Sequence, residues 1–386
     1  MRLTLVPLVS QCLTLGACGS TPTDDAGQDG EAFATANRDD NGADAMASND
    51  AAAPADSLPD SEQRPVMQAQ VMLERLGFGP GVIDGKTGPS LSNAITGFQE
   101  ARDLPVTGEL DDATRLALMA GKATPATRIV TIPEAWGEIT FMPMPDGAAK
   151  QAKMERLGYE TLAEKLAERF HTTSDVLAQL NPGGRPAGAD GASAAPPPAA
   201  SGADSAPVFK PGQQVRVPNI GGDRIAADSV ENKDWLETLR SLGVGTDQPT
   251  VARIVVDESD GWLKAFDDKD RLVAMFTVTT GSRNDPLPIG AWDVKGKAYN
   301  PPYAYDPKLL RGAPDSDDTQ QLPPGPNGPV GVVWIDLSKE HYGIHGTPAP
   351  ETIGSAQSNG CVRLTNWDAA RLAQMVNGST KVLFQK

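Results

Sequence analysis

The sequence predicts a multidomain protein in which a mainly β domain follows a small three-helix domain and an α+β module. Apolar residues recur at helical spacing as far as about residue 182, whereas short β-rich runs separated by Asp and Gly turns begin near residue 250. With 386 residues, 39 Gly, 33 Pro and 39% hydrophobic residues, the chain has room for two or three domains joined by unfolded stretches.

A disordered acidic tether is predicted over residues 19–65. Residues 21–65 hold eleven Asp and Glu but only two Arg, a net charge of −9 out of −16 for the whole chain. So few apolar side chains occur there that their burial could not offset the entropy lost on ordering. The acidity is therefore that of a solvated tether, and the chain lacks the basic footprint of a nucleic-acid-binding protein.

Residues 1–18 resemble the signal of a bacterial lipoprotein. Arg2 precedes an apolar run over 3–15 that is too short to cross a bilayer as a helix. The run leads into Leu15-Gly16-Ala17-Cys18, which is similar to a lipobox and implies cleavage before Cys18 and lipidation of its thiol. An ordinary secretory signal is the alternative. Both interpretations predict a periplasmic protein of the cell envelope, and the first adds a lipid anchor to the outer membrane.

Three helices are predicted over residues 66–123. Apolar residues at helical spacing mark the first two, and Asp111 or Asp112 can cap a third that ends near Ala120. The block resembles the peptidoglycan-binding domain (type 1) family at Leu73, Leu76-Gly77-Phe78, Ile83-Asp84-Gly85, Gly88-Pro89, Ala94, Phe98-Gln99, Leu104-Pro105-Val106-Thr107-Gly108 and Thr114. The resemblance implies binding to the glycan or stem peptides of peptidoglycan. A domain that serves mainly as a spacer is the alternative.

Residues 148–220 are predicted to form an α+β module with a low-complexity insertion at 183–205. The apolar face of its first helix is made by Leu162, Leu166, Ala167 and Phe170. The helical part and the closing segment 210–218 resemble a LysM module at Thr161-Leu162-Ala163, Val176-Leu177, Leu180-Asn181-Pro182 and Pro211-Gly212. A generic two-helix unit is the alternative.

Residues 250–386 have the pattern of a mainly β domain. Short β-rich runs occur at 251–256, 262–266, 272–278, 330–335 and 381–384. Residues 299–329 are rich in Pro and Gly, and loops of this length in compact domains are often lids. Thr365-Asn366-Trp367-Asp368 begins a predicted helix that runs to Val376, with Trp367 and Met375 in the core.

The residues that could perform chemistry lie near the end of this domain. His345 begins His345-Gly346-Thr347, and Cys361 follows sixteen residues later within Ser358-Asn359-Gly360-Cys361-Val362-Arg363. Cys361 is the thiol that remains once Cys12 is removed with the signal and Cys18 is lipidated. A free thiol is mostly protonated at neutral pH, and an imidazole can take its proton. Cys361 and His345 are therefore a candidate nucleophile and base.

These stretches resemble the signature of L,D-transpeptidase (YkuD-type) catalytic domains, which implies a β-sandwich over residues 250–386. The resemblance implies a Cys thioester with a tetrapeptide stem of peptidoglycan, release of D-Ala and transfer to an amine acceptor in cell-wall cross-linking or remodelling. The acceptor is left open between a stem amine, a lipoprotein lysine, a D-amino acid and water. The alternatives are an L,D-carboxypeptidase or endopeptidase of the same fold, and a non-catalytic peptidoglycan-binding lipoprotein.

Residues beside the nucleophile have candidate roles in supporting the reaction. The N–H groups of Gly360 and Cys361 can form an oxyanion hole, and Ser358 can brace the loop by hydrogen bonds. Arg363 can pair with a stem carboxylate or form a structural salt bridge. Asn359 stands where many family members have His, so it can donate a hydrogen bond but cannot exchange a proton near neutral pH.

The chain has three histidines, and the motif selects His345 among them. The resemblance implies that a backbone carbonyl, here that of Gly346, orients the His345 ring. His341 is expected on the same strand and the same face as His345, four residues away. His171 is expected at the surface of the helical block. Three scattered histidines and one thiol make no ligand set, so neither a metal nor a cofactor is predicted.

Overall fold

The computed structural model describes residues 59–120, 124–189, 209–220, 225–282, 285–309, 318–356, 358 and 360–386. All of them belong to one compact unit. The predicted signal with Cys18, most of the tether, most of the insertion and Asn359 lie outside the described residues. Among the residues described, no helix is both long enough and apolar enough to span a membrane.

Three helices form the first domain, as predicted. They are α2 (Pro65–Arg75), α3 (Pro89–Ala101) and α4 (Asp112–Met119). Proline at the first position of α2 and α3 suits a helix start, where its missing N–H would have no partner. Asp111 caps α4, because its carboxylate accepts a hydrogen bond from the Thr114 N–H.

The second unit pairs two strands with two helices. Strand β2 (Thr127–Thr131) is antiparallel to β3 (Gln214–Pro218), and α6 (Leu162–Arg169) and α7 (Ser174–Leu180) lie between them in the chain. Strand β2 lies before residue 148, where the module was predicted to begin. Buried and exposed residues do not alternate clearly along this strand, so no strand was predicted there. The shorter helices here are η1 (Glu134–Glu138), α5 (Ala148–Gln151) and η2 (Pro182–Gly184).

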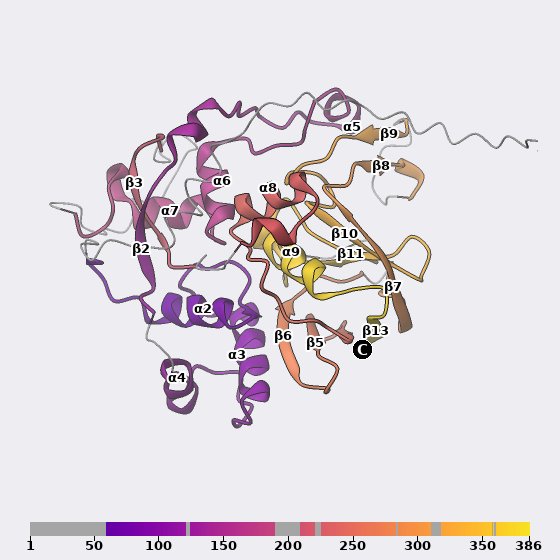
Figure 1. The fold of residues 1–386 in the computed structure, drawn as a ribbon, viewed down its shortest axis with the longest axis horizontal. Helices are drawn as coiled ribbons and strands as arrows, with labels where there is room; N and C mark the ends of the chain where they lie inside the picture. Colours follow the sequence, from indigo (N-terminus) through magenta and orange to yellow (C-terminus); the bar gives the residue numbers. More distant parts are fainter. Residues whose placement is uncertain are drawn as a thin grey trace, which may run out of the picture. The chain divides into compact units, whose positions relative to one another are not determined.

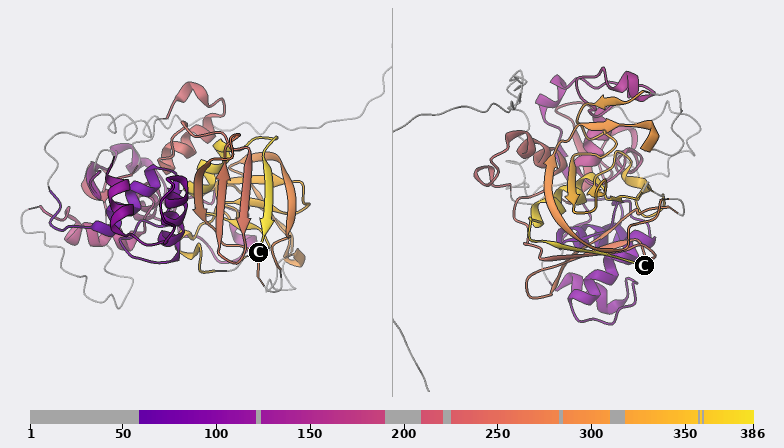
Figure 2. Two further views of the ribbon diagram at one scale, coloured as in Figure 1. Left: turned by 90° about the horizontal axis from the view of Figure 1, so that it is seen from below. Right: turned by 90° about the vertical axis from the view of Figure 1, so that its right-hand side faces the viewer.

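Nine strands form the sheet of the C-terminal domain, in the order β1-β6-β5-β4-β13-β7-β10-β11-β12 (Figure 1). Figure 2 shows strands of this sheet side by side. Eight of them come from the C-terminal domain: β4 (Arg253–Asp257), β5 (Trp262–Phe266), β6 (Leu272–Thr277), β7 (Gly290–Tyr299), β10 (Val333–Leu337), β11 (Gly343–His345), β12 (Val362–Arg363) and β13 (Lys381–Gln385).

Strand β7 connects the two halves of the sheet. Its first part, from Gly290 to Asp293, pairs with β13, and its second part, from Val294 to Tyr299, pairs with β10. Hydrogen bonding therefore continues across all nine strands. The length of β7 makes this possible, since a ten-residue strand can pair with different neighbours along its two halves.

The ninth strand comes from the three-helix domain. Strand β1 (Phe78–Gly79) pairs in parallel with β6, with Phe78 opposite Met275. Helix α3 packs beside it, where a Cβ on Gly97 would come within 2.8 Å of the Met275 Cβ. Lys264 on β5 adds an ion pair of 2.6 Å to Glu100 on α3. The three-helix domain is thus part of the sheet's edge.

Two helices pack on the apolar core of the sheet. Helix α9 (Asn366–Met375) is capped by the Thr365 hydroxyl, which accepts from the Asp368 N–H, and both Trp367 and Met375 are buried as predicted. Helix α8 (Lys233–Leu242) joins the same core through Trp235 and Leu239. A 3-10 turn η3 (Ala227–Ser229) precedes α8.

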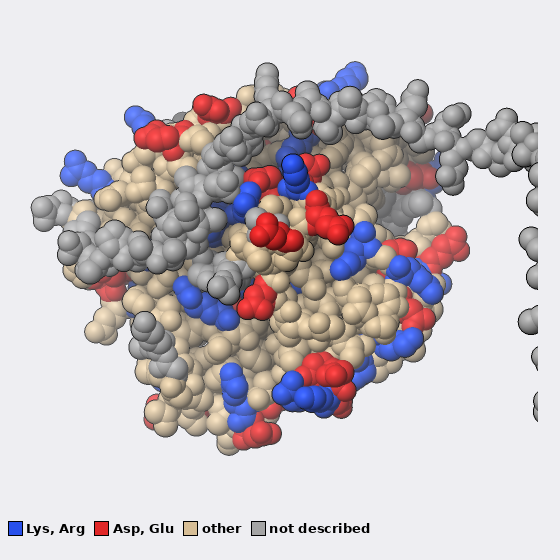
Figure 3. Space-filling view, viewed as in Figure 1, with Lys and Arg blue, Asp and Glu red and all other residues tan. Residues whose placement is uncertain are grey.

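Residues 299–329 contain more structure than expected. Strands β8 (Tyr303–Tyr305) and β9 (Gln320–Leu322) form an antiparallel pair, and η4 (Pro307–Leu309) follows β8. Figure 3 shows acidic and basic side chains interspersed on the face drawn, without a broad area of one sign.

Candidate active site

The two candidate catalytic residues come from neighbouring strands. Strands β11 and β12 are parallel, with Ile344 opposite Val362 and His345 opposite Arg363. Cys361 directly precedes β12, and a backbone hydrogen bond links its thiol to Gly343 on β11. The register therefore sets Cys361 opposite Gly343, two positions before His345 on the neighbouring strand.

The His345 ring is buried and held in one orientation. Its side chain is only 4% exposed, and it stacks on Trp334, its cross-strand neighbour, with ring centroids 5.4 Å apart. Nδ1 lies 2.7 Å from the Gly346 carbonyl oxygen, an acceptor, so Nδ1 is the nitrogen that bears the proton in the neutral ring. The lone pair is then on Nε2.

Burial and, to a smaller extent, the positive charge of Arg363 lower the pKa of His345 to about 4, although the Gly346 hydrogen bond opposes both effects. The imidazole is therefore neutral at neutral pH. A neutral ring can accept a proton, which is what a general base must do.

Cys361 is a free, half-buried thiol. Its Sγ lies 3.9 Å from the His341 carbonyl oxygen. Burial raises the pKa of the thiol, while the Gly343 hydrogen bond and the charge of Arg363 partly oppose that rise. At rest the Cys361 thiol and the His345 imidazole are therefore both uncharged and do not form an ion pair.

Two small residues shape the loop before Cys361. Gly360 has φ +97°, and a Cβ there would come within 2.8 Å of the Tyr342 ring, so glycine fits on both counts. The Ser358 hydroxyl donates to the Cys361 carbonyl at 2.6 Å, and the Ser358 N–H donates to the Thr280 carbonyl at 2.9 Å. The loop is thereby fastened to the segment after β6.

Arg363 lies next to His345 in the register of β11 and β12. Its backbone exchanges two hydrogen bonds with Thr279, of 2.8 and 3.0 Å. Its guanidinium Nε is buried without a hydrogen-bond partner, and none of the carboxylates described forms an ion pair with this side chain. Within the described part of the chain, the structural salt bridge that was the alternative role for Arg363 is therefore not present.

The other two histidines differ from expectation. His341 lies outside β11 with φ +65° and is 76% exposed, because a residue in the left-handed region ends the strand alternation. The prediction that it shares a strand with His345 was wrong. His171 was expected at the surface but is 1% exposed, since the turn after α6 directs it inward.

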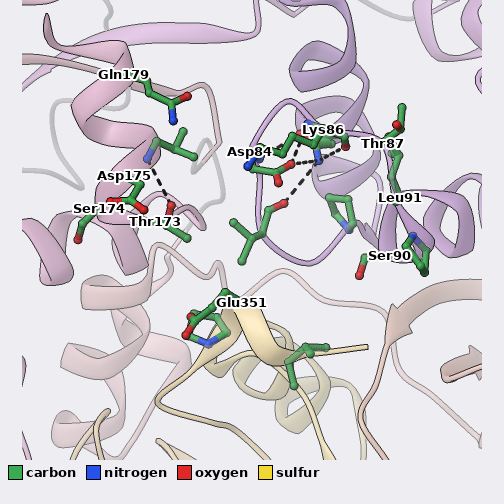
Figure 4. Close-up of a pocket in the computed structure, with 18 residues that line it drawn as sticks. Asp84, Lys86, Thr87, Ser90, Leu91, Thr173, Ser174, Asp175, Gln179 and Glu351 are labelled. Atoms are coloured by element: carbon green, nitrogen blue, oxygen red, sulfur yellow. Dashed lines mark hydrogen bonds between the residues drawn. The ribbon is translucent and has the colours of Figure 1, made fainter. Parts of the chain in front are cut away.

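A groove of 590 Å³ lies among all three domains, and its lining includes neither Cys361 nor His345. In Figure 4, Thr173, Asp175 and Gln179 lie on one side, Asp84 and Lys86 on the other, and Glu351 below them. The structure thus has a polar groove separate from the thiol.

A thiol directly before β12 and a neutral histidine on β11 are the residue types that cysteine-nucleophile sites combine. Comparison with known proteins identifies the class more closely. Residues 251–383 match the family described as "L,D-transpeptidase catalytic domain". Residues 62–118 match the family described as "Putative peptidoglycan binding domain".

Individual relatives agree with the first match. The chain is 29% identical over 165 residues to "Putative L,D-transpeptidase YkuD" of Bacillus licheniformis, covering 43% of this chain and 79% of that protein. It is 49% identical over 61 residues to the Bacillus subtilis protein of the same name, covering 16% of this chain and 37% of that protein. Residues 251–383 are thus similar to L,D-transpeptidase catalytic domains, and they lie in the C-terminal part of the chain.

A solved structure of L,D-transpeptidase 3 from Mycobacterium tuberculosis shares 19% identity. The similarity covers 37% of this chain and 62% of that one, with a TM-score of 0.30.

Proposed function

We propose that Cys361 is the nucleophile and His345 the general base of a thioester mechanism on peptidoglycan tetrapeptide stems. His345 Nε2 takes the thiol proton as Sγ attacks the carbonyl between the third residue and the terminal D-Ala. The same proton passes to the leaving amine as the C–N bond breaks and D-Ala departs. An amine acceptor then loses its proton to His345, attacks the thioester and releases the thiolate, which regains that proton.

The neutral state of His345 is the observation that supports this assignment most. A proton on Nδ1, held by the Gly346 carbonyl, leaves Nε2 as the basic nitrogen. Gly346 thus acts as the orienting group. Because the thiol is also neutral at rest, proton transfer accompanies the attack rather than preceding it.

The loop before Cys361 stabilises the tetrahedral intermediate in this proposal. The N–H groups of Gly360 and Cys361 supply the oxyanion hole, and Asn359 can add a side-chain donor. Support comes from the positive φ of Gly360 and from the Ser358 hydrogen bonds, which fix the backbone that presents these N–H groups.

Arg363 binds a carboxylate of the stem peptide. Its position opposite His345 and its lack of a carboxylate partner among the described residues support this role. A guanidinium can bind a carboxylate through two parallel hydrogen bonds.

The N-terminal modules hold the enzyme at the wall. The strand–helix–helix–strand order of β2, α6, α7 and β3 supports the LysM-like assignment, with the first strand at Thr127–Thr131. A lipobox-like signal ending at Cys18 supports a periplasmic protein anchored by lipid to the outer membrane. The acidic tether over 19–65 then spans the distance from that membrane to the wall.

Intact mass spectrometry tests the nucleophile directly. The folded, reduced protein is incubated with a carbapenem or with a tetrapeptide stem, alongside Cys361→Ala. An adduct on the parent protein alone supports Cys361 as the acylated residue. No adduct with either compound contradicts the thioester mechanism.

Product analysis then distinguishes transfer from hydrolysis. With stem peptide and a D-amino acid acceptor, transpeptidation yields an exchanged stem, whereas a carboxypeptidase yields only the shortened stem and free D-Ala.

A further inference from the structure

Asn366, the first residue of α9, is fully buried. It lies between the loop before β10, the residue that follows β11, and helix α6 of the second unit. Its side-chain NH₂ donates to Glu168 Oε1 at 2.7 Å and to the Pro326 carbonyl at 3.1 Å. Its side-chain oxygen accepts from the Val332 N–H at 3.2 Å. Every polar atom of this amide therefore has a partner, which fixes the side chain in one position.

The same side chain backs the peptide that holds the catalytic base. A Cβ added to Gly346 would overlap the Asn366 oxygen and come within 3.3 Å of the Asn366 Cα. Gly346 is the residue whose carbonyl accepts from His345 Nδ1 at 2.7 Å. A shift of Asn366 would therefore free the Gly346 peptide to move, and the ring of His345 with it.

Helix α6 of the second unit supplies Glu168, the third neighbour of Asn366. This carboxyl group is 8% exposed and bonds to Asn366 across a separation of 198 residues. Burial raises the pKa of Glu168 to about 7, and the oxygen that faces Asn366 can accept in either protonation state. A residue outside the catalytic domain thus contacts the group that backs Gly346.

We propose that Asn366 is a positioning residue for the base His345, and that Glu168 of the second unit completes this positioning. The inference rests on the proposed role of His345. It means that the second unit is required for an ordered catalytic site, in addition to any contact that it makes with the wall.

Two pairs of variants test this in the full chain. Asn366→Ala removes the backing of Gly346, and we expect carbapenem acylation to slow by about 10- to 100-fold, as small misplacements of catalytic groups do. Glu168→Ala should also slow carbapenem acylation. Glu168→Gln should restore the parent rate, because a Gln oxygen can accept the same hydrogen bond.

Asn327→Ala is the matched control. Asn327 also bridges the catalytic domain to the second unit, donating to Glu164 at 2.7 Å and to the Gly158 carbonyl at 3.0 Å, but it does not contact Gly346. Its loss should leave acylation within about threefold of the parent, an effect of under 1 kcal/mol on the barrier. Equal losses for Asn327→Ala and Asn366→Ala would show a general docking effect and overturn the inference.

The tautomer of His345 gives a readout other than rate. Nitrogen NMR of histidine-labelled protein should show His345 protonated at Nδ1 in the parent and in Asn327→Ala, and a tautomer mixture in Asn366→Ala and Glu168→Ala. An unchanged tautomer and rate in both of the latter variants would refute the positioning role. Absence of acylation in the parent protein would instead contradict the proposed function itself.

Discussion

His345 and His171 are alike in their surroundings yet suited to different tasks. Both are buried, and both stack on a tryptophan, Trp334 for His345 and Trp367 for His171. Both also place Nδ1 beside an acceptor, the Gly346 carbonyl in one case and the Glu74 carboxylate at 2.9 Å in the other. Burial, ring stacking and an oriented Nδ1 therefore do not by themselves distinguish a catalytic histidine from a structural one.

The second ring nitrogen makes the difference. Nε2 of His171 lies 2.9 Å from the Leu242 carbonyl, so both of its ring nitrogens face acceptors within the protein. For His345 the described residues give a hydrogen-bond partner to Nδ1 alone, and Nε2 is the nitrogen that the proposed mechanism uses.

His171 belongs to a charged cluster that joins all three domains. Glu74 on α2 accepts from His171 and pairs with Arg371 on α9 at 3.2 Å. Arg371 also donates to the Glu74 carbonyl at 2.7 Å. His171 thus contributes to the junction between domains, whereas His345 is the proposed general base.

The largest effect on this comparison is expected from replacing the ring of His345, the proposed general base. His345→Gln should lower the rate of carbapenem acylation by about 10²- to 10⁴-fold, because the general base is lost. The rate is measured by intact mass over time. The free energy of unfolding should change far less than for variants of the junction cluster, and a normal acylation rate would remove His345 from the mechanism.

Removing the Glu74 carboxylate from the junction should instead lower stability strongly and change the acylation rate little. Glu74→Ala leaves Arg371 and His171 buried without their shared anion, so we expect a loss of about 3–5 kcal/mol in the free energy of unfolding. Urea denaturation measures this loss. Acylation per folded molecule should remain within about threefold of the parent, and unchanged stability would disprove the structural role of the cluster.

Acid pH sharpens the comparison further. The folded pKa of His345, about 4, lies below the ordinary value of 6.5, so protons bind more tightly to the unfolded chain. The stability that neutral His345 contributes is complete above pH 6.5 and is lost as pH falls towards 4, by at most ~3 kcal/mol. His345→Gln should reduce this loss when the two proteins are compared by urea denaturation at pH 7 and pH 4.5.

The same pKa of His345 predicts that acylation persists to pH 5. A fall in the acylation rate centred near pH 6.5 would contradict it.

The smallest effect is expected at Asp368, beside the junction cluster. Burial and the nearby Glu74 carboxylate raise the pKa of Asp368 well above its ordinary value. A raised carboxyl pKa costs stability progressively as pH increases from the unfolded value through the folded one. Asp368→Asn removes that cost, so it should stabilise the protein by about 1 kcal/mol or less near pH 7. The gain should be smaller at pH 5, and a gain that does not grow with pH would argue against the raised pKa.

Local patterns in the sequence predicted much of the fold. The three helices of the first domain, the capped helix α9 and five strands of the sheet follow apolar periodicity, caps and turns that a single sequence displays. The spacing of His345 and Cys361 likewise selected two residues that lie on β11 and directly before its neighbour β12. Helix α8 was not predicted, although Asn232, Gly243 and the apolar residues between them gave the signal.

Features that depend on distant partners were not predictable in this way. Strand β1 has only two residues, and its partner β6 is about two hundred positions later. The burial of His171 depends on Glu74 and on the carbonyl of Leu242, which no periodicity links to it. The sequence marks Asn366 only as the first residue of a helix, whereas its contacts with Glu168 and Gly346 depend on the tertiary structure.

Strand β1 has a further consequence for the solubility of the catalytic domain. An unpaired edge strand exposes N–H and C=O groups that can pair with another molecule and begin aggregation. Strand β6 reads Leu-Val-Ala-Met-Phe-Thr, and the two residues of β1 cover its outer edge near Met275 and Phe276. Cutting the chain before residue 250 would uncover an apolar edge suited to self-association, so the three-helix domain also protects the sheet against intermolecular β pairing.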